Sequence, residues 1–482
     1  MWLCGSNHPV LTGRLLPPDC GGHVEEKLVS ELRRIVGEDW LVTDPELMEG
    51  YLLDVTALPV RPVPSRDVVV VKPANAAEIS AVLKLANAEK TIVVPRGGGT
   101  GCVGAAVPTM GGIVLSLERL DRIIEVDQDN LMVVAEAGAT LEKMLKAVEE
   151  ADLLFPPHPG DEGAQVGGLV ACNAGGTRAV KYGVVRQYVK GLEVVLPTGE
   201  IVTMGGKLLK NNTGLDLMQL MIDSEGILGI ITKVIFRLYP RFANTATLVI
   251  SFDDRHAAIA AVPRILQTGT TPLALEYVER DVIQISADYL GKKWPATKGT
   301  AHLIAIFTGN GEEDVYAQCA SVIEACESLG AVDTLMAETR EEQAEILKIR
   351  SELYPALKPR VSDVLDMAIP PAKIAVFLDM VDEIGQKYGS PIITYGHAGD
   401  GNLHPHVPLD YHERGLLSDV KHEIYEAAAK LGGVVTAEHG VGKIRLAEMP
   451  LCLDSKSLEL MQGIKKAFDP NGILNPGTAI PM

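Results

Sequence analysis

Three histidines surround an Asp-Gly pair in segment 395–406, and imidazoles at that spacing could bind a metal. Asp-Gly between two strand-like runs is a strong signal for a two-residue hairpin loop, here at Asp400. In that register His397 lies directly opposite His404, with Cβ atoms about 5 Å apart. Two imidazoles at that distance can bind one divalent cation. His406 would face Tyr395, one step further from the loop, where it would support the site.

The glycine-rich run 95–101 could bind phosphate, because it follows an expected strand at 91–94. Gly99, Gly101 and Gly104 have the G-x-G-x-x-G spacing of a dinucleotide-binding Rossmann fold. That motif must open a helix, and the proline and two glycines that follow will not sustain one. Consecutive glycines can instead form an anion nest around a pyrophosphate. A purely structural turn is the remaining alternative.

Two further glycine clusters, 167–176 and 223–231, lie in the same half of the chain. Three such clusters in one domain are what one long phosphate-containing cofactor would need, because bare backbone permits close approach. We therefore expect the N-terminal half to bind a nucleotide cofactor.

The composition is that of a globular, acidic protein with more than one domain. The chain has 482 residues, 47% of them hydrophobic, and a net charge of −19, which argues against a nucleic-acid partner. No apolar run is long enough to predict a transmembrane segment. Residues 1–23 do not resemble a signal peptide and are expected to be a loose extension. The seven cysteines form no C-x-x-C pair, so we expect reduced thiols in a cytoplasmic protein without an iron–sulfur cluster.

Alternating helical and strand patterns predict an α+β protein with its main boundary near residue 240. Residues 24–240 form the glycine-rich domain, and 241–433 a second α+β domain with a helix expected at 340–357. From residue 434 the chain returns to glycine-rich turns.

These motifs together resemble the FAD-linked D-2-hydroxyacid dehydrogenases. This branch of the vanillyl-alcohol-oxidase-type flavoproteins includes the glycolate oxidase FAD subunit, D-lactate dehydrogenase and D-2-hydroxyglutarate dehydrogenase. The resemblance covers residues 25 to the C-terminus and depends on the runs 95–101, 166–168, 173–176, 182–184, 191–196, 224–226, 396–402, 438–442 and 475–477. It implies a vanillyl-alcohol-oxidase-type (PCMH-type) FAD-binding domain at 24–240 and a substrate (cap) domain at 241–433. Segment 434–482 would complete the active site and return to the FAD domain.

The resemblance implies noncovalent FAD, with the 95–101 loop at the pyrophosphate. The implied cofactor-binding residues are Pro95, Arg96, Gly97, Gly98, Gly99, Thr100, Gly101, Pro157, His158, Gly160, Gly167, Gly168, Asn173, Gly175, Gly176, Tyr182, Gly183, Val184, Glu225, Gly226, Ile230 and Asn475. Covalent relatives carry a nucleophilic side chain near the flavin. Cys102 is the candidate in the loop, and we expect it to be a packed small residue.

The resemblance also gives the hairpin a third metal ligand. Glu438 would bind one divalent ion, Zn²⁺, Mn²⁺ or Fe²⁺, together with His397 and His404. Extended backbone would turn Glu438 and His439 to opposite faces. His439 is the implied general base, and Asn402 is expected to orient substrate or flavin.

A carboxylate substrate calls for a forked donor, and Arg350 lies in the arginine-containing helix that the resemblance predicts. Tyr354, at i+4, would share its face and join the clamp. A surface ion pair of Arg350 with a neighbouring glutamate is the alternative. The hydroxyglutarate-specific relatives carry a lysine where this chain has Val364 or Leu365, which favours a small monocarboxylate.

The implied reaction is oxidation of a small D-2-hydroxy acid, D-lactate before glycolate, to the 2-oxo acid by hydride transfer to flavin N5. The metal and Arg350 would hold the substrate, and His439 would take the hydroxyl proton. Electrons would leave to an external acceptor, such as an electron-transfer flavoprotein or iron–sulfur subunit. A non-catalytic or oxygen-using flavoprotein subunit of a larger oxidase complex is the alternative. Homo- and hetero-oligomers both stay open, and any membrane attachment would be made through a partner.

Overall fold

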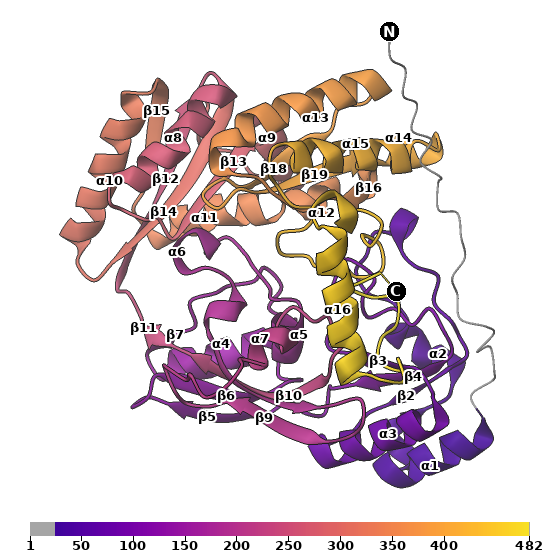
Figure 1. Cartoon of the computed structure of the whole chain (residues 1–482). Helices are drawn as coiled ribbons and strands as arrows, with labels where there is room; N and C mark the ends of the chain where they lie inside the picture. The colour runs from indigo at the N-terminus through magenta and orange to yellow at the C-terminus, as the bar shows by residue number, and fades with distance from the viewer. Residues whose placement is uncertain (1–24, 482) are drawn as a thin grey trace.

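The computed structural model describes residues 25–481, which form two lobes with the C-terminal helix beside both (Figure 1). The predicted loose extension 1–23 lies outside the described residues. In the lower lobe of Figure 1 a mixed sheet has the order β1-β2-β4-β3. Its strands are β1 (Leu41–Val42), β2 (Val68–Val71), β4 (Gly112–Ser116) and β3 (Val93–Arg96), with helices α1 (Glu26–Val36), α2 (Pro45–Met48) and α3 (Ala76–Glu89).

Strand β3 includes Pro95 and continues to Arg96, two residues beyond the expected strand end. It lies at the sheet edge and pairs in parallel with β4. An edge strand tolerates a proline because one row of its backbone groups is unpaired. The glycine-rich loop therefore starts directly from a buried strand end.

A second, antiparallel sheet completes this lobe in the order β5-β6-β10-β8-β9. Its strands are β5 (Ile123–Asp127), β6 (Met132–Glu136), β10 (Ile230–Arg237), β8 (Val189–Val195) and β9 (Ile201–Gly205). The accompanying elements are α4 (Leu141–Glu150), β7 (Leu153–Leu154), α5 (Val166–Ala171), α6 (Ala179–Tyr182), α7 (Met218–Met221) and β11 (Tyr239–Pro240). Strands β8 and β9 form an antiparallel hairpin, with Gly199 in its turn.

The upper lobe has an eight-stranded antiparallel sheet. Its order is β15 (Ala331–Ala337), β12 (Asn244–Phe252), β14 (Ala301–Gly309), β13 (Ala274–Glu279), β18 (Ile393–His397), β19 (Asn402–Pro408) and β16 (Val361–Val364), and β17 (Met367–Ala368) pairs with β19. Leu248 and Ile250 pack on one face of the sheet and Val249 on the other, as alternation along a strand requires. Because both faces are covered, the strands are apolar nearly throughout.

Helices cover the two faces of this sheet in separate groups. The first face holds α8 (Arg255–Gln267), α10 (Glu312–Glu327), α13 (Ile374–Tyr388) and α15 (Leu417–Lys430), with α14 (Leu409–Glu413) beside them. The second face holds α9 (Arg280–Tyr289), α11 (Arg340–Ser351) and α12 (Leu353–Leu357). The expected single helix 340–357 is thus wrong: it breaks at Glu352, and α12 contains a proline.

The C-terminal segment returns to the first lobe. Helix α16 (Ser455–Phe468), yellow in Figure 1, runs down beside it, and Leu474 forms a parallel bridge with Val93. Ile473 and Leu474 belong to the hydrophobic core of the lower lobe. We retain 240/241 and 433/434 as proposed domain boundaries. Across residues 25–481, none of the helices combines the length and apolar character needed to span a membrane.

Candidate active site

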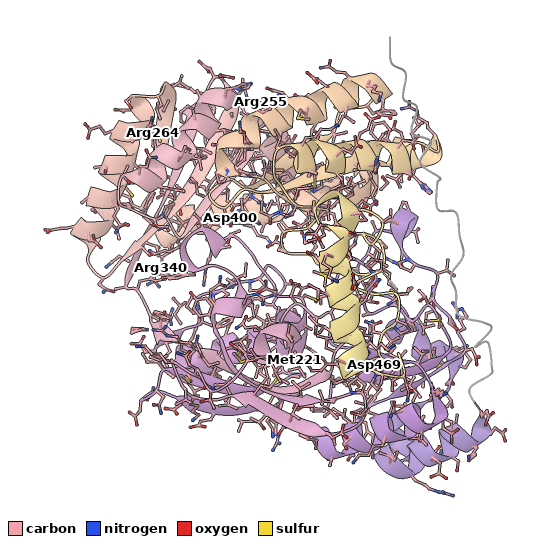
Figure 2. The ribbon with its side chains drawn as sticks, viewed as in Figure 1. Met221, Arg255, Arg264, Arg340, Asp400 and Asp469 are labelled. Atoms are coloured by element: carbon pink, nitrogen blue, oxygen red, sulfur yellow. The ribbon has the colours of Figure 1, made fainter. Side chains whose placement is uncertain are left out.

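A cavity of about 970 Å³ lies between the two lobes. Its walls come from the glycine loop after β3, the segments around Gly160, Gly175 and Gly226, and the cap face that carries α11, α12, β13, β18 and β19. The β18–β19 loop reaches the lower lobe here: Asp400 lies at the edge of the upper lobe (Figure 2), and a Cβ on Gly399 would meet Val180 of α6 at 2.6 Å. The hairpin tip therefore packs against the lower lobe.

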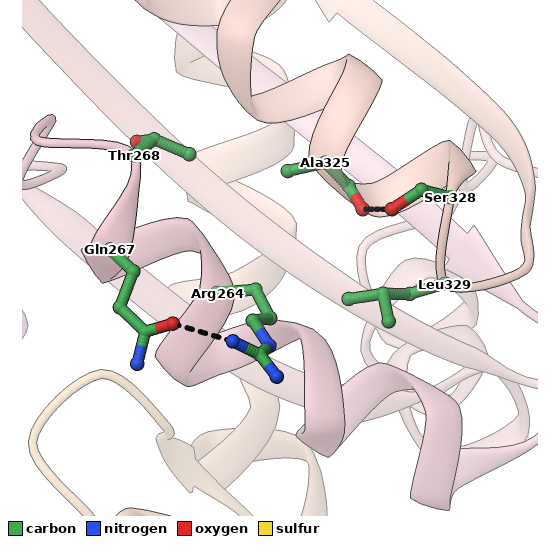
Figure 3. A pocket seen from close by; sticks show the side chains of 6 residues that line it. All are labelled: Arg264, Gln267, Thr268, Ala325, Ser328 and Leu329. Atoms are coloured by element: carbon green, nitrogen blue, oxygen red, sulfur yellow. Dashed lines mark hydrogen bonds between the residues drawn. The ribbon is translucent and has the colours of Figure 1, made fainter.

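A smaller hollow of about 230 Å³ lies beside α8 and α10 (Figure 3). Its polar side chains bond within their own helical turns, Arg264 to Gln267 at 2.9 Å and Ser328 to the Ala325 carbonyl at 2.7 Å. It shares no lining residue with the large cavity. Its six lining side chains include no histidine or carboxylate, so we place the candidate site in the large cavity.

Most of the residues predicted to bind the cofactor line this cavity. They are Pro95, Arg96, Gly97, Gly98, Gly99, Thr100, Gly101, His158, Gly160, Gly167, Gly168, Gly175, Gly176, Glu225, Gly226, Ile230 and Asn475. The predicted residues that do not line it are Pro157, Asn173, Tyr182, Gly183 and Val184. Three of these five have structural roles. The Asn173 side chain accepts the Arg186 backbone N–H at 3.0 Å, and the Tyr182 carbonyl accepts the Tyr188 hydroxyl at 2.8 Å. Gly183 ends α6 at φ +70°.

The glycine loop could accommodate a pyrophosphate, because its backbone borders the cavity. Behind the loop at Gly98 there is no room for a side chain larger than glycine. A Cβ on Gly98 would meet the Gly163 carbonyl at 3.0 Å. Arg96 lies behind the loop and donates to the backbone carbonyls of Leu53 at 2.8 Å and Gly50 at 2.9 Å. No helix follows Gly104 directly, as expected from the sequence. Cys102 lines the same cavity, and its predicted role as a packed small residue stays a prediction.

The predicted hairpin register is wrong by two residues, because His404 is not the partner of His397. His397 pairs with Asn402, Tyr395 with His404, and Ile393 with His406, so the loop has four residues. Asp400 caps the loop by accepting the Asn402 N–H at 3.1 Å, and the Gly399 N–H donates to β13 at 3.0 Å. These tertiary contacts favour the longer loop over the two-residue turn. His397 and His404 become diagonal neighbours, and their ring centroids lie 5.4 Å apart.

The two imidazoles and Glu438 converge on one point. Nε2 of His397 and Nε2 of His404 each lie 3.6 Å from the same atom, Oε1 of Glu438. Nδ1 of His397 meets Oε1 of Glu276 at 2.6 Å, an arrangement that leaves the Nε2 lone pair for a metal. A Cβ on Gly175 would meet Oε2 of Glu438 at 2.5 Å, so the lower lobe also limits where this carboxylate lies.

Glu438 and His439 do not point to opposite faces, contrary to the expectation from extended backbone. Both line the cavity, and Nε2 of His439 lies 4.0 Å from Oε1 of Glu438. The reason is the buried carboxylate of Asp366: its Oδ2 accepts the N–H groups of Ala437, Glu438 and His439, each at 2.8 Å. Three consecutive N–H groups can converge on one oxygen only if the backbone curves around it. Both side chains then project to the same side.

Four residues in this cluster, His397 not among them, have ligand atoms close enough together to hold a metal ion. His404, Glu438, His439 and Asp366 can bring ligand atoms within 4.8 Å of one another. Both oxygens of Asp366 already accept hydrogen bonds. Oδ2 accepts the three backbone N–H groups, and Oδ1 accepts the Asn402 amide N–H at 2.7 Å. His397 is not part of this set, but unlike His439 it has a carboxylate that fixes its far nitrogen.

Charge in this cluster shifts the histidine pKa values in opposite directions. Burial opposes the charged form, but Glu276 and Glu438 hold the pKa of His397 well above its usual value. Burial is likewise outweighed at His439, where Cys102 and Asp366 raise the pKa. Burial and His439 lower the pKa of His404. The histidine pKa values therefore depend on the buried acids around them.

Arg350 and Tyr354 both line the cavity. Helix α11 begins with a capping box, in which Thr339 and Glu342 each bond the other's backbone N–H at 3.2 Å. Arg350, near its end, pairs with buried Glu276 at 2.5 Å and not with a surface glutamate. Its Nε is buried and has no hydrogen-bond partner among residues 25–481.

Asn402 does not line the cavity. Its amide donates to Asp366 at 2.7 Å and to the Met367 carbonyl at 3.2 Å, so its contacts are structural. Val364 does line the cavity, whereas Leu365 is fully buried in the core behind it. Of the two positions considered for the relatives' lysine, Val364 is the one that lines the cavity.

Two functional residues were not anticipated from the sequence, Glu276 and Asp366. Each is a single acid inside an apolar strand-like run, and each is at most 2% exposed. A lone carboxylate in such a run must be paired when it is buried. That pattern could have marked both, although it names no partner.

Comparisons with known proteins agree with this geometry. A family model described as "FAD binding domain" matches residues 68–205, and one described as "FAD linked oxidases, C-terminal domain" matches residues 242–479. D-lactate dehydrogenase of Archaeoglobus fulgidus is 42% identical over 90% of this chain and 96% of its own length. Glycolate oxidase subunit GlcD of Bacillus subtilis is 36% identical over 85% of this chain and 88% of its own.

Solved structures show the same fold. p-Cresol methylhydroxylase with substrate bound superposes with a TM-score of 0.76 at 19% identity, covering 94% of this chain and 96% of that one. The chain therefore has the PCMH-type FAD-binding fold with a cap domain, as expected from the sequence. It belongs to the FAD-linked oxidase family and is a flavin-dependent oxidoreductase.

Proposed function

We propose that this protein is a FAD-dependent dehydrogenase of small D-2-hydroxy acids that passes electrons to an external acceptor. The observation that carries the proposal is the convergence of His397 Nε2 and His404 Nε2 on Glu438 Oε1, at 3.6 Å each, in the cavity that the glycine loop also lines. The relatives named D-lactate dehydrogenase and glycolate oxidase subunit support it.

We propose that His397, His404 and Glu438 hold one divalent ion. Two imidazoles and one carboxylate suit Zn²⁺, Mn²⁺ or Fe²⁺, and Glu276 orients His397 for such a role. An ion bound there would act as a Lewis acid on a substrate oxygen. Its positive charge would also oppose the high pKa that the acids around His439 impose, since like charges disfavour protonation.

Arg350 holds the substrate carboxylate in this proposal. Its Nη2 is engaged by Glu276 at 2.5 Å, and its buried Nε–H has no partner among the described residues. Glu276 thereby fixes the guanidinium plane before substrate arrives, which lowers the ordering cost of binding. Tyr354 lines the same wall and can donate its hydroxyl to the carboxylate.

His439 accepts the proton of the substrate hydroxyl. The imidazole stacks on His404 with ring centroids 5.3 Å apart, and Asp366 holds its backbone N–H at 2.8 Å. Its Nδ1 is buried without a partner in the described part of the chain. Bound FAD supplies the acceptor for the hydride of C2. The fixed ring position keeps the base beside the reacting carbon.

D-lactate is the favoured substrate and glycolate the second. Hydroxyglutarate-specific relatives are expected to carry a lysine where this chain has Val364 or Leu365, and neither side chain offers a cation to a distal carboxylate. The electron acceptor is proposed to be an electron-transfer flavoprotein or an iron–sulfur subunit, in the cytoplasm. A subunit role in a larger assembly is compatible with the relative named as a glycolate oxidase subunit.

Anaerobic flavin bleaching tests the proposal directly. The holoprotein is mixed with D-lactate, glycolate, L-lactate and D-2-hydroxyglutarate, with and without prior chelation. We expect fast bleaching by D-lactate and loss of it after chelation, with recovery on adding one of the three ions. Bleaching by none of these acids in FAD- and metal-replete protein would refute the proposal and favour a non-catalytic subunit. Rapid reoxidation of the reduced flavin by air would replace the external acceptor with oxygen.

A further inference from the structure

Tyr395 is a buried side chain of the cavity wall, and its ring contacts two polar groups of the candidate site. The residue is 4% exposed and lines the cavity. The guanidinium carbon of Arg350 lies over the ring, 4.9 Å from its centroid. The imidazole of His406 stacks on the ring with centroids 4.6 Å apart and an interplanar angle of 24°. Because the stacked imidazole fills one face, the guanidinium lies on the other.

Strand β18 places Tyr395 beside the candidate metal site. Tyr395 and His397 are two residues apart, so their side chains lie on the same face of the sheet, about 7 Å apart along the strand. Helices α9, α11 and α12 pack on that face, and Tyr395 belongs to their hydrophobic cluster. Arg350 extends from α11 to the ring and to Glu276 of the neighbouring strand β13. The carboxylate clamp and the metal site therefore share one strand.

The contacts of Arg350 leave one of its nitrogens for a ligand. Nη2 donates to Oε2 of Glu276 at 2.5 Å, and the other oxygen of Glu276 contacts His397. Nε is buried and has no partner among residues 25–481. Nη1 forms no hydrogen bond in the described structure, and it is not among the sealed atoms. Because Arg350 lines the cavity, Nη1 is the donor available to a carboxylate there.

The Tyr395 ring adds a restraint on Arg350 to the one that Glu276 provides. Glu276 meets the guanidinium at one nitrogen, whereas the ring lies against its central carbon. The contact at the carbon opposes tilting of the group about the contact at the nitrogen, and the attraction of a cation to an aromatic face is stronger where water is excluded. A planar donor bonds a carboxylate through two parallel N–H groups only when the two planes align. A guanidinium that is already held in place also binds at a lower entropic cost.

We propose that Tyr395 is a positioning residue for substrate binding, whose ring holds Arg350 so that Nη1 meets the substrate carboxylate. The inference rests on the proposed function, in which Arg350 binds that carboxylate. The ring acts through Arg350 and takes no part in proton or hydride transfer. Its loss should therefore weaken substrate binding more than it slows the chemical step.

Stopped-flow bleaching of the metal-loaded holoprotein tests the role of the ring. The readouts are the half-saturating concentration of D-lactate and the limiting rate of anaerobic flavin reduction. Tyr395→Leu keeps an apolar side chain but removes the aromatic face, so the half-saturating concentration should rise about 10-fold while the limiting rate falls less. Tyr395→Phe keeps the aromatic face and should remain close to wild type in both readouts.

Two further variants separate positioning from packing. Pentafluorophenylalanine at position 395 keeps the ring shape but makes its face positive, so the half-saturating concentration should rise toward that of Tyr395→Leu. The matched control is Tyr239→Leu, because the Tyr239 ring also contacts a guanidinium, that of Arg237 at 4.5 Å, but is not one of the described residues that line the cavity. The control should match wild type in both readouts. FAD absorbance and thermal unfolding establish that each variant is folded.

Calorimetric titration with oxamate, an unreactive carboxylate, measures the coupling between the two side chains. Tyr395→Leu should weaken oxamate binding about 10-fold when Arg350 is present. In the Arg350→Gln background the same change should have far less effect, because the guanidinium that the ring positions is gone.

The outcomes separate this inference from the proposed function. A half-saturating concentration of folded Tyr395→Leu within about twofold of wild type, or an equal loss of oxamate affinity in the Arg350→Gln background, would overturn the role of the ring. A Phe variant as weak as the Leu variant would assign the effect to the hydroxyl and overturn it as well. If Tyr395→Leu does not fold, the Phe and pentafluorophenylalanine variants decide. Failure of every hydroxy acid to bleach wild-type flavin would reject the proposed function, while the oxamate titration still tests the ring.

Discussion

The substitution Glu276→Gln probes the buried acid that connects the carboxylate clamp to the metal site. Glu276 is 2% exposed, and its two oxygens bind Arg350 at 2.5 Å and His397 at 2.6 Å. Although burial opposes its charge, His397 and Arg350 hold the pKa of Glu276 below its usual value. Glutamine preserves the volume but removes the charge and replaces one acceptor by an NH₂ donor.

That donor would face Nδ1–H of His397. To pair with it, the imidazole must move its proton to Nε2, where the metal lone pair is needed. Loss of such a carboxylate behind a metal-binding histidine typically costs 10–100-fold in metal affinity. Removing one partner of a buried ion pair typically lowers the unfolding free energy by about 3–5 kcal/mol. We expect a loss of about 3 kcal/mol here, because the amide oxygen of glutamine can still accept a hydrogen bond from Arg350.

The assay is metal content after dialysis against graded chelator, with flavin reduction by D-lactate measured on the same samples. The matched control is Glu279→Gln, which makes the same change three residues along β13 on a side chain that is 41% exposed. The control should retain metal, flavin and turnover. Metal affinity of Glu276→Gln within twofold of wild type would refute the assignment of His397 as a ligand oriented by Glu276.

Three further predictions follow from the same geometry. His439→Ala should retain FAD and lose flavin reduction by D-lactate about 10²–10⁴-fold, whereas the exposed control His422→Ala should match wild type in stopped-flow traces. Gly175→Ala should cut metal content at least about 10-fold, because its methyl would lie 2.5 Å from Glu438 Oε2; full metal loading would contradict this. Burial raises the pKa of Glu225 from 4.5 to about 7, so the folded state binds its proton more tightly than the unfolded state does. The unfolding free energy of wild type relative to Glu225→Gln should therefore fall by about 3 kcal/mol between pH 4 and 8 in urea titrations, and a pH-independent difference would reject the shift.

The local motifs were predictable because their physics is local. The absence of a helix directly after the glycine run that follows β3 could be predicted from the sequence alone, since glycine spacing and the proline that follows decide whether a helix can form. The same holds for the presence of the 395–406 hairpin and for the change of character near residue 240. The hairpin spacing paired His397 with His404, the family resemblance added Glu438 and Arg350, and all four line one cavity.

The hairpin register and the backbone curvature at Glu438 and His439 could not be predicted from these local signals. Asp-Gly favours a two-residue turn in isolation, but Gly399 bonds β13 and packs on α6, and these contacts select a four-residue loop. Extended backbone would have separated Glu438 from His439, but the Asp366 carboxylate bends the chain around itself. Both outcomes depend on groups far away in sequence.

The sequence by itself predicted which residues would carry the chemistry: the glycine loop, the histidines of the hairpin and the Glu438–His439 pair. Only the tertiary structure decided how they are held. Glu276 binds His397 across 121 residues, and Asp366 binds His439 across 73. A buried carboxylate must find donors, but its own neighbours in sequence do not say where those donors lie. The partners are chosen when strands and lobes pack, and that packing fixes the nitrogen atoms that face the cavity.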